Sequence, residues 1–156
     1  MNVFIVGAGP GDPELITVKG QKLLSEADVI IYAGSLVNPA LLDYAKAGCE
    51  IHNSASMTLP QVINVIEDSV KQGKMVVRLH TGDPSIYGAI QEQMDALDKL
   101  GIEYKVVPGV SSFLATAAAL KQEYTLPGIS QTVIITRNEG RTPVPDREKL
   151  RSLAAH

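Results

Sequence analysis

Three glycine-containing turns are the segments of this sequence best suited to bind a ligand. They are Gly7-Ala8-Gly9-Pro10-Gly11-Asp12-Pro13, His80-Thr81-Gly82-Asp83-Pro84-Ser85-Ile86-Tyr87-Gly88 and Pro108-Gly109-Val110-Ser111-Ser112. Glycine allows a tight backbone turn and lets amide groups approach a ligand closely, while hydroxyl and carboxylate side chains add polar contacts. Because no catalytic triad or metal cluster accompanies them, these residues favour the binding of a flat, nucleotide-like cofactor.

The first turn departs from the two common phosphate-binding motifs. Asp12 occupies the position of the third glycine in a dinucleotide fingerprint, and a proline interrupts the loop. An NAD site also needs an acidic residue after the second strand, where Tyr32-Ala33-Gly34-Ser35 stands instead. No Gly-Lys-Ser/Thr follows the turn, which excludes a P-loop. An NAD-dependent oxidoreductase is therefore disfavoured, and a non-catalytic nucleotide-binding or regulatory α/β module stays open as an alternative to an enzyme.

The second turn repeats the Gly-Asp-Pro triplet of residues 11–13. Asp as a helix N-cap and Pro as the first helical residue would explain both triplets without any ligand. The same turn carries His80 and Tyr87, which are candidate catalytic bases. A lone histidine at a strand end is more often part of a hydrogen-bonded framework, so no catalytic residue is assigned.

Short apolar, β-branched runs alternate with longer helical patterns along the chain, which predicts βα units and a largely parallel, buried sheet. The predicted strands are Val3–Gly7, Val29–Tyr32, Glu50–His52, Met75–His80, Tyr104–Val107 and Thr132–Thr136. The predicted helices are Pro13–Ala27, Pro39–Ala47, Leu59–Gln72, Ser85–Leu100 and Ser111–Leu120, with a short helical pattern from Asp146 onward. In a parallel sheet all three turns open at the carboxyl ends of strands, where such sheets bind ligands.

Composition limits the class of partner. The chain has 156 residues, 45% of them hydrophobic, and its 14 Lys+Arg and 17 Asp+Glu are spread without runs, which argues against nucleic acid. Cys49 is the only cysteine, so the sequence predicts no disulfide and no cysteine-based metal site, as in a reducing compartment. With no basic leader and no apolar run of about 20 residues, we expect a cytoplasmic protein that does not enter a membrane.

Taken in order, the three turns resemble the tetrapyrrole (corrin/porphyrin) methylase family over essentially the whole chain. Further stretches resemble the branch of that family that acts on precorrin-4 or cobalt-precorrin-4: Tyr32-Ala33-Gly34-Ser35-Leu36-Val37, Ser54-Ala55-Ser56-Met57-Thr58-Leu59 and Ile135-Thr136-Arg137-Asn138-Glu139-Gly140-Arg141-Thr142-Pro143. The resemblance implies an S-adenosyl-L-methionine (SAM)-dependent methyltransferase of cobalamin biosynthesis. It would methylate C-11 of the macrocycle and release S-adenosyl-L-homocysteine.

The resemblance also implies the residues of the site. It assigns the SAM site to Pro10, Thr81, Gly82, Asp83, Ile86, Ser111 and Ser112. The substrate's carboxylates call for cationic or amide partners, for which the candidates are Asn53, Ser54, Ser56, Arg137 and Arg141. Family members that methylate uroporphyrinogen carry an aspartate where this chain has Ala33, and a Lys-Arg pair close to His52-Asn53, so the later precorrin step is favoured.

The family fold has two α/β domains, with SAM in the cleft between them and the macrocycle in a trough above the first. We therefore expect an N-terminal α/β domain over residues 1–120, with a mostly parallel five-stranded sheet flanked by helices, and a linker with the incomplete start of a second α/β domain over residues 121–156. The predicted strand Thr132–Thr136 would be an unpaired apolar edge that docks on the first domain or pairs with another chain, which predicts a homodimer. The 156-residue chain alone is expected to bind SAM poorly and to be inactive, because the family places part of the cofactor contacts on the second domain.

Overall fold

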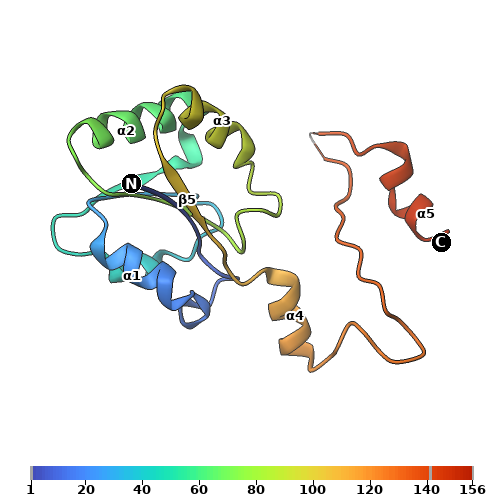
Figure 1. The fold of residues 1–156 in the computed structure, drawn as a ribbon. Helices are drawn as coiled ribbons and strands as arrows, with labels where there is room; N and C mark the ends of the chain where they lie inside the picture. The colour runs from blue at the N-terminus through green and yellow to red at the C-terminus, as the bar shows by residue number, and fades with distance from the viewer. Residues whose placement is uncertain (1, 141, 156) are drawn as a thin grey trace. The chain divides into compact units, whose positions relative to one another are not determined.

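The computed structural model describes residues 2–140 and 142–155 (Figure 1). The chain forms two compact units, residues 1–116 and residues 117–156. Helix α4 (Ser112–Leu120) runs across the boundary between them.

The first unit is built on one five-stranded parallel sheet, which confirms the predicted fold class. The strand order is β3-β2-β4-β1-β5. The strands are β1 (Val3–Gly7), β2 (Val29–Tyr32), β3 (Glu50–Asn53), β4 (Val76–His80) and β5 (Tyr104–Val107). They match the first five predicted strands to within one residue at each end, because each is a short segment that contains β-branched residues.

Helices cover both faces of the sheet (Figure 1). Helix α1 (Val18–Glu26) packs on one face, and helices α2 (Leu59–Lys71) and α3 (Gln91–Lys99) pack on the other. Successive strand residues point to opposite faces, so Val77 belongs to the α1 side and its neighbour Val76 to the α2 and α3 side. Strands β1 and β2 are therefore largely apolar, as expected for a sheet buried on both faces, whereas β4 also carries Arg78 and His80.

Strands β1 and β4 are neighbours whose following helices lie on opposite faces of the sheet. The chain leaves β1 through α1 toward β2, and it leaves β4 through α3 and crosses β1 to reach β5. Such a reversal opens a crevice at the carboxyl ends of the two strands, and doubly wound α/β proteins bind ligands there. Gly7 of β1 is paired with His80 of β4, so the turns that follow both strands begin at the same level.

The predicted helix Ser85–Leu100 is wrong over its first turn and a half, because α3 begins only at Gln91. Tyr87 and Ala89 adopt left-handed backbone conformations, with φ of 55° and 49°, and a right-handed helix cannot pass through such residues. The triplet around Asp83 therefore does not cap a helix. It opens an irregular loop that runs from residue 81 to residue 90.

The other predicted helices differ less from the structure. The predicted Pro13–Ala27 divides into a 3-10 helix, Pro13–Leu15, and α1, because the Thr17 hydroxyl caps a new helix by accepting from the Gly20 amide at 3.0 Å. The predicted Pro39–Ala47 is a 3-10 helix over Pro39–Tyr44. A further 3-10 helix, Ser54–Ser56, follows β3.

The second unit contains a 3-10 helix, Asp146–Glu148, and the short helix α5 (Leu150–Leu153). The predicted strand Thr132–Thr136 is wrong: the segment has no regular secondary structure, and Val133, Ile134 and Ile135 are exposed. A β-branched sequence favours an extended chain but forms a strand only beside a pairing partner, and no described segment of this unit supplies one.

Candidate functional site

The turns after β1, β4 and β5 contact one another through their backbones. The Ala8 amide donates to the His80 carbonyl at 2.7 Å, and Gly9 and Gly82 exchange two backbone hydrogen bonds of 3.2 and 2.8 Å. A Cβ atom at Gly109 would overlap the Gly82 carbonyl and lie 2.8 Å from the Cα of Gly7. Because a Cβ makes such contacts impossible, glycine is required where these backbones meet.

Asp83 joins two of these turns. Its Oδ1 atom accepts from the Ser85 amide at 2.8 Å, and its Oδ2 atom accepts from the Gly109 amide at 2.9 Å. Asp12, in the matching triplet of the first turn, accepts locally from the Glu14 amide at 2.9 Å. The same three-residue sequence therefore serves two purposes: a local turn at residues 11–13, and a bridge between the β4 and β5 turns at residues 82–84.

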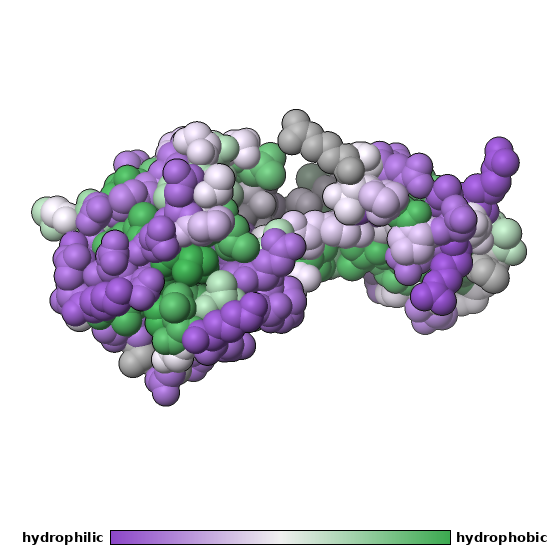
Figure 2. Space-filling model, turned by 90° about the horizontal axis from the view of Figure 1, so that it is seen from above, coloured by the Kyte–Doolittle hydropathy of each residue, from purple (hydrophilic) through white to green (hydrophobic). Residues whose placement is uncertain are grey.

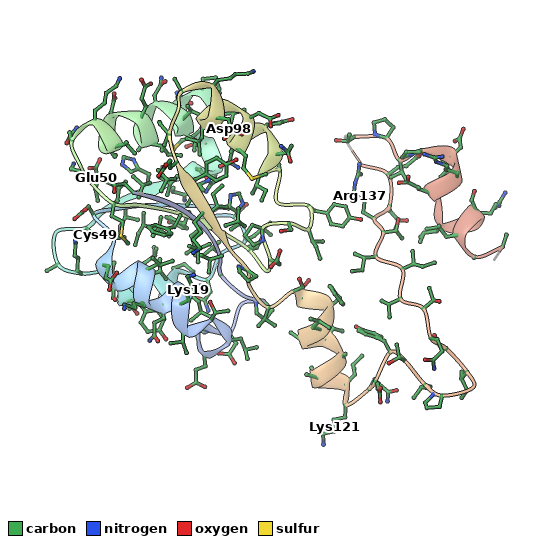
Figure 3. The ribbon with its side chains drawn as sticks, in the orientation of Figure 1. Lys19, Cys49, Glu50, Asp98, Lys121 and Arg137 are labelled. Atoms are coloured by element: carbon green, nitrogen blue, oxygen red, sulfur yellow. The ribbon has the colours of Figure 1, made fainter. Side chains whose placement is uncertain are left out.

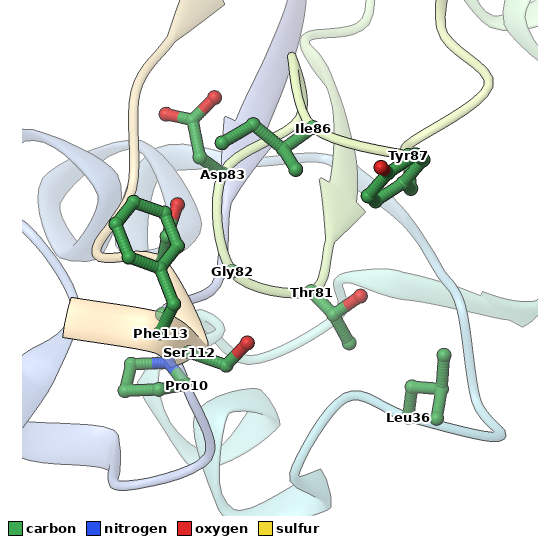
Figure 4. Close-up of a pocket in the computed structure, with 11 residues that line it drawn as sticks. Pro10, Leu36, Thr81, Gly82, Asp83, Ile86, Tyr87, Ser112 and Phe113 are labelled. Carbon is green, nitrogen blue, oxygen red and sulfur yellow. The ribbon is translucent and has the colours of Figure 1, made fainter. Parts of the chain in front are cut away.

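A pocket of about 390 Å³ opens over the three turns (Figure 4). It is lined by Gly9, Pro10, Leu36, Thr81, Gly82, Asp83, Ile86, Tyr87, Ser111, Ser112 and Phe113. The structure thus brings together all seven residues that the resemblance assigned to a SAM site, and the candidate base Tyr87 with them. Gly9, Leu36 and Phe113 were not foreseen as lining residues, although Gly9 and Leu36 stand inside quoted motifs and Phe113 directly follows one.

The pocket combines apolar walls with a few polar groups. Leu36, Ile86 and Phe113 offer apolar surface, and the hydroxyls of Thr81, Ser111 and Ser112 offer donors and acceptors. Asp83 is the charged residue of this lining. A cavity that joins apolar walls with convergent polar groups suits a small organic ligand, and the volume lies in the range of such sites.

His80 lies behind this pocket and does not line it. Its side chain is buried, and its Nε2 atom faces the Gln93 amide nitrogen at 3.5 Å. Burial, together with the positive charge of Arg78, lowers the pKa of His80 to about 3. Tyr87, by contrast, is 61% exposed and lies on the pocket wall. The surroundings of His80 are those of a hydrogen-bonded framework residue.

The buried His80 should make the folded chain sensitive to mild acid. Since an unfolded histidine has a pKa near 6.5, the unfolded chain takes up a proton below this pH that the folded chain does not bind. We expect the free energy of unfolding to fall by roughly 1 kcal/mol per pH unit between about pH 6.5 and 5. Urea unfolding across this range measures the slope. His80→Asn, which cannot titrate, should remove most of it, and an unchanged slope in that variant would contradict the assignment.

The candidate substrate residues lie at the carboxyl end of β3 but do not line the pocket. Asn53 is the last residue of β3, and Ser54 and Ser56 belong to the 3-10 helix that follows. The Ser54 hydroxyl donates to the Tyr32 carbonyl at 3.0 Å, and Asn53 Oδ1 accepts from the Ala55 amide at 2.9 Å. The amide group of Asn53 also fills the space where a Cβ atom on Gly34 would lie. These contacts fix the loops after β2 and β3 to each other, and Ser56 remains exposed beside them.

Arg137 belongs to the second unit (Figure 3). Its guanidinium donates to the carbonyls of Asn138, Thr142 and Pro143 at 3.0 to 3.3 Å, so it holds its own loop in shape. Arg141, the other cationic candidate, lies outside the described residues. Within the described residues, no three His, Cys, Asp or Glu side chains group together as metal ligands would.

On the face seen in Figure 2, polar side chains are interspersed with smaller apolar areas. Among the residues that the structure describes, no helix has the length and apolar composition needed to cross a bilayer.

Residues 2–156 match the family of tetrapyrrole (corrin/porphyrin) methylases. The chain belongs to it. The chain is 67% identical over 154 residues to the cobalt-precorrin-4 C(11)-methyltransferase of Methanocaldococcus jannaschii, and 51% identical over 156 residues to the precorrin-4 C(11)-methyltransferase of Pseudomonas aeruginosa. The two alignments span 99% and 100% of this chain but only 60% and 62% of the two relatives.

Solved structures show the same similarity. An X-ray structure of a cobalt-precorrin-4 methyltransferase superposes with a TM-score of 0.94 and 55% sequence identity, over 97% of this chain and 64% of that one. A uroporphyrin-III C-methyltransferase from Thermus thermophilus, solved as a complex with S-adenosyl homocysteine, superposes with a TM-score of 0.70 and 34% identity, over 85% of this chain and 53% of that one.

Proposed function

We propose that the chain carries the cofactor-binding turns of a SAM-dependent methyltransferase that methylates C-11 of precorrin-4 or cobalt-precorrin-4 in cobalamin biosynthesis. The observation that carries the proposal is the convergence of Pro10, Thr81–Asp83, Ile86 and Ser111–Ser112 on one pocket at the β1 and β4 ends. The names of the similar proteins support the choice of reaction and substrate.

The residues present fit this cofactor. The apolar side chains of Leu36, Ile86 and Phe113 suit an adenine ring, and nearby hydroxyls suit the ribose and the amino acid portion. Asp83 places a negative charge in the wall, which suits a ligand with a sulfonium and an ammonium group. When bound, SAM supplies a methyl group already activated on sulfur.

The chain's own part in the reaction is then alignment and exclusion of water. A rigid pocket that presents donor and acceptor in line can contribute a large rate factor without a nucleophilic side chain. Asn53, Ser54 and Ser56 lie at the carboxyl end of β3, on the same side of the sheet as the three turns. They are the proposed contacts for the substrate's carboxylates. Arg137 and Arg141 are further proposed contacts for these carboxylates. A homodimeric state and a cytoplasmic location are also proposed.

Calorimetry separates this proposal from the alternative of a non-catalytic nucleotide-binding module. The experiment uses the full-length protein, which means a protein as long as these relatives. It is titrated with S-adenosylhomocysteine, NADH and ATP. The proposal requires binding of S-adenosylhomocysteine in preference to the other two. Binding of ATP alone would instead favour the nucleotide-binding module, and binding of NADH alone would favour an NAD-dependent oxidoreductase.

The substrate assignment predicts selectivity. We expect the full-length protein to methylate precorrin-4 or its cobalt form at least about 100-fold faster than uroporphyrinogen, because Ala33, directly after β2, offers no carboxylate at that position. Mass spectrometry of the macrocycle, with S-adenosylhomocysteine release as a second readout, measures both rates. Comparable rates on uroporphyrinogen would assign the chain to the uroporphyrinogen branch of its family.

A further inference from the structure

Three buried polar side chains interrupt the apolar layer between β4 and α3. Arg78 and His80 lie on β4 and Gln93 on α3, with exposed fractions of 7%, 5% and 6%. Burial lowers the pKa of Arg78 to about 10, so its guanidinium keeps its charge at neutral pH. Burying such groups costs free energy unless they are hydrogen-bonded, so their arrangement calls for an explanation.

The hydrogen bonds fix the orientation of the Gln93 amide. Arg78 can only donate, and its Nε lies 3.1 Å from Gln93 Oε1, so this oxygen is the acceptor. The amide nitrogen must then face the other way, where the Ala89 carbonyl lies at 3.1 Å and His80 Nε2 at 3.5 Å. The Ala89 carbonyl is an acceptor. His80 Nε2 is also an acceptor when the ring is neutral with its hydrogen on Nδ1, and a neutral ring agrees with the lowered pKa of His80.

Arg78 is itself held by the sheet. Its Nη1 atom donates to the Ile31 carbonyl of β2 at 3.2 Å. The network therefore runs from β2 through Arg78 to Gln93, and from Gln93 to the backbone of the loop before α3. Gln93 is the link between the rigid sheet and this loop.

The loop that Gln93 holds is conformationally strained. Tyr87 and Ala89 both have left-handed φ values, 55° and 49°, and a Cβ atom on the intervening Gly88 would overlap the Pro84 carbonyl. Non-glycine residues in this region cost of the order of 1 kcal/mol or more each, and they persist only where the surroundings impose them. The bond from Gln93 to Ala89 is such a restraint, one residue beyond Gly88.

Tyr87 connects this strained loop to the candidate site. It lines the candidate pocket, and it also lines a second cavity of about 380 Å³ together with Pro84, Gly88, Gln91 and Met94. Tyr87 is thus a wall shared by two cavities. Because Tyr87 lines the candidate pocket (Figure 4), a change of its backbone conformation would alter the boundary of that pocket.

We propose that Gln93 is a positioning residue, which holds Tyr87 at the wall of the candidate pocket by donating to the Ala89 carbonyl while Arg78 fixes the orientation of its amide. What the pocket binds rests on the proposed function. The anchoring itself does not, so it can be tested separately.

Hydrogen exchange tests the anchoring on this chain. Gln93→Glu keeps the size of the side chain and the acceptor for Arg78 but replaces the donor to Ala89 with a second acceptor. The Ile86 and Met94 amides report on this loop, because they donate to the Asp83 and Ile90 carbonyls at 3.3 and 2.9 Å. We expect both amides to exchange at least about 10-fold faster, with β1 and β4 unchanged. Gln21→Glu, the same change at an exposed position of α1, should have no effect on this segment. Unchanged exchange of the Ile86 and Met94 amides would overturn the proposal.

A second substitution covers the possibility that a buried carboxylate unfolds the chain. Gln93→Met fills the same space without charge and removes both hydrogen bonds. It should accelerate exchange of the Ile86 and Met94 amides in the same way, whereas global unfolding would accelerate the strands equally. If the Ile86 and Met94 amides keep wild-type protection in folded Gln93→Met, and exchange is fast only in unfolded molecules, the proposal is overturned.

A double-mutant cycle in the full-length protein tests the effect on the site. Gln93→Met should lower kcat/KM for methyl transfer about 10-fold when Tyr87 is present and have little further effect in a Tyr87→Ala background. A purely structural role would give the same loss in both backgrounds and would overturn the positioning role. If the full-length protein transfers no methyl group at all, the proposed function fails, and the exchange result still decides whether Gln93 anchors the loop.

Discussion

Gly109→Ala is expected to abolish tight binding of S-adenosylhomocysteine, with a loss of affinity of at least about 100-fold. The added methyl group would overlap the Gly82 carbonyl and lie 2.8 Å from the Gly7 Cα. Both obstacles are backbone atoms of strand-anchored turns, so no side-chain rotation can relieve the contact. The three turns would have to separate, and overpacking of this kind typically costs about 1–3 kcal/mol of stability.

Gly140→Ala is the matched control, because a Cβ atom at Gly140 meets nothing within 4 Å. Calorimetric titration and thermal unfolding of the full-length protein measure both variants. Gly82 provides an informative contrast: a Cβ there would meet its nearest atom, the Ser111 Cα, at an ordinary 3.7 Å, but its φ of +56° disfavours any side chain. Wild-type affinity in Gly109→Ala would show that the contact of the three turns does not shape the binding site.

The sheet could be predicted from the sequence because its information is local. Each strand is a short segment that contains β-branched residues, and Val29–Tyr32 is an example in which the predicted and observed bounds agree. The same local signal failed at Thr132–Thr136, because a strand also needs a pairing partner, and a partner is not a property of the segment.

The start of α3 illustrates a second limit of local patterns. Asp83-Pro84 has the composition of a helix start, but the Asp83 carboxylate binds the distant Gly109 amide. The left-handed conformations at Tyr87 and Ala89, which are not glycines, give no signal in the sequence. Gln93 is likewise an ordinary helix residue by composition, and only the fold shows that it lies buried between Arg78 and His80.

The candidate site was predictable where motif residues follow strands directly. Parallel pairing brings the carboxyl ends of the strands, and the residues that follow them, to the same side of the sheet. The seven residues of the predicted SAM site therefore meet at one pocket. Residues whose chemistry alone suggested a role were less informative. The charge of Arg137 suggested a carboxylate partner, but in the structure three backbone carbonyls accept its hydrogen bonds.

Asp83→Asn should weaken binding of S-adenosylhomocysteine by about 10- to 100-fold, although it changes a single atom. Asp83 accepts one hydrogen bond with each carboxylate oxygen, from the Ser85 and Gly109 amides. An asparagine has one oxygen, so its amide nitrogen must face one of these N–H groups. The loss of a charge-assisted bond and the unsatisfied donor left behind cost about 1–3 kcal/mol.

The repeated triplet supplies the control for this prediction. Asp12→Asn makes the same change where the side chain uses one oxygen, to the Glu14 amide, so asparagine can keep that bond. We expect affinity within about 2-fold of wild type for Asp12→Asn, because asparagine is as good a cap as aspartate. Calorimetry on the two variants of the full-length protein makes the comparison. Equal losses in both would mean that Asp83 acts as a local turn residue like Asp12, and that its bond to Gly109 does not hold the β4 and β5 turns in their binding arrangement.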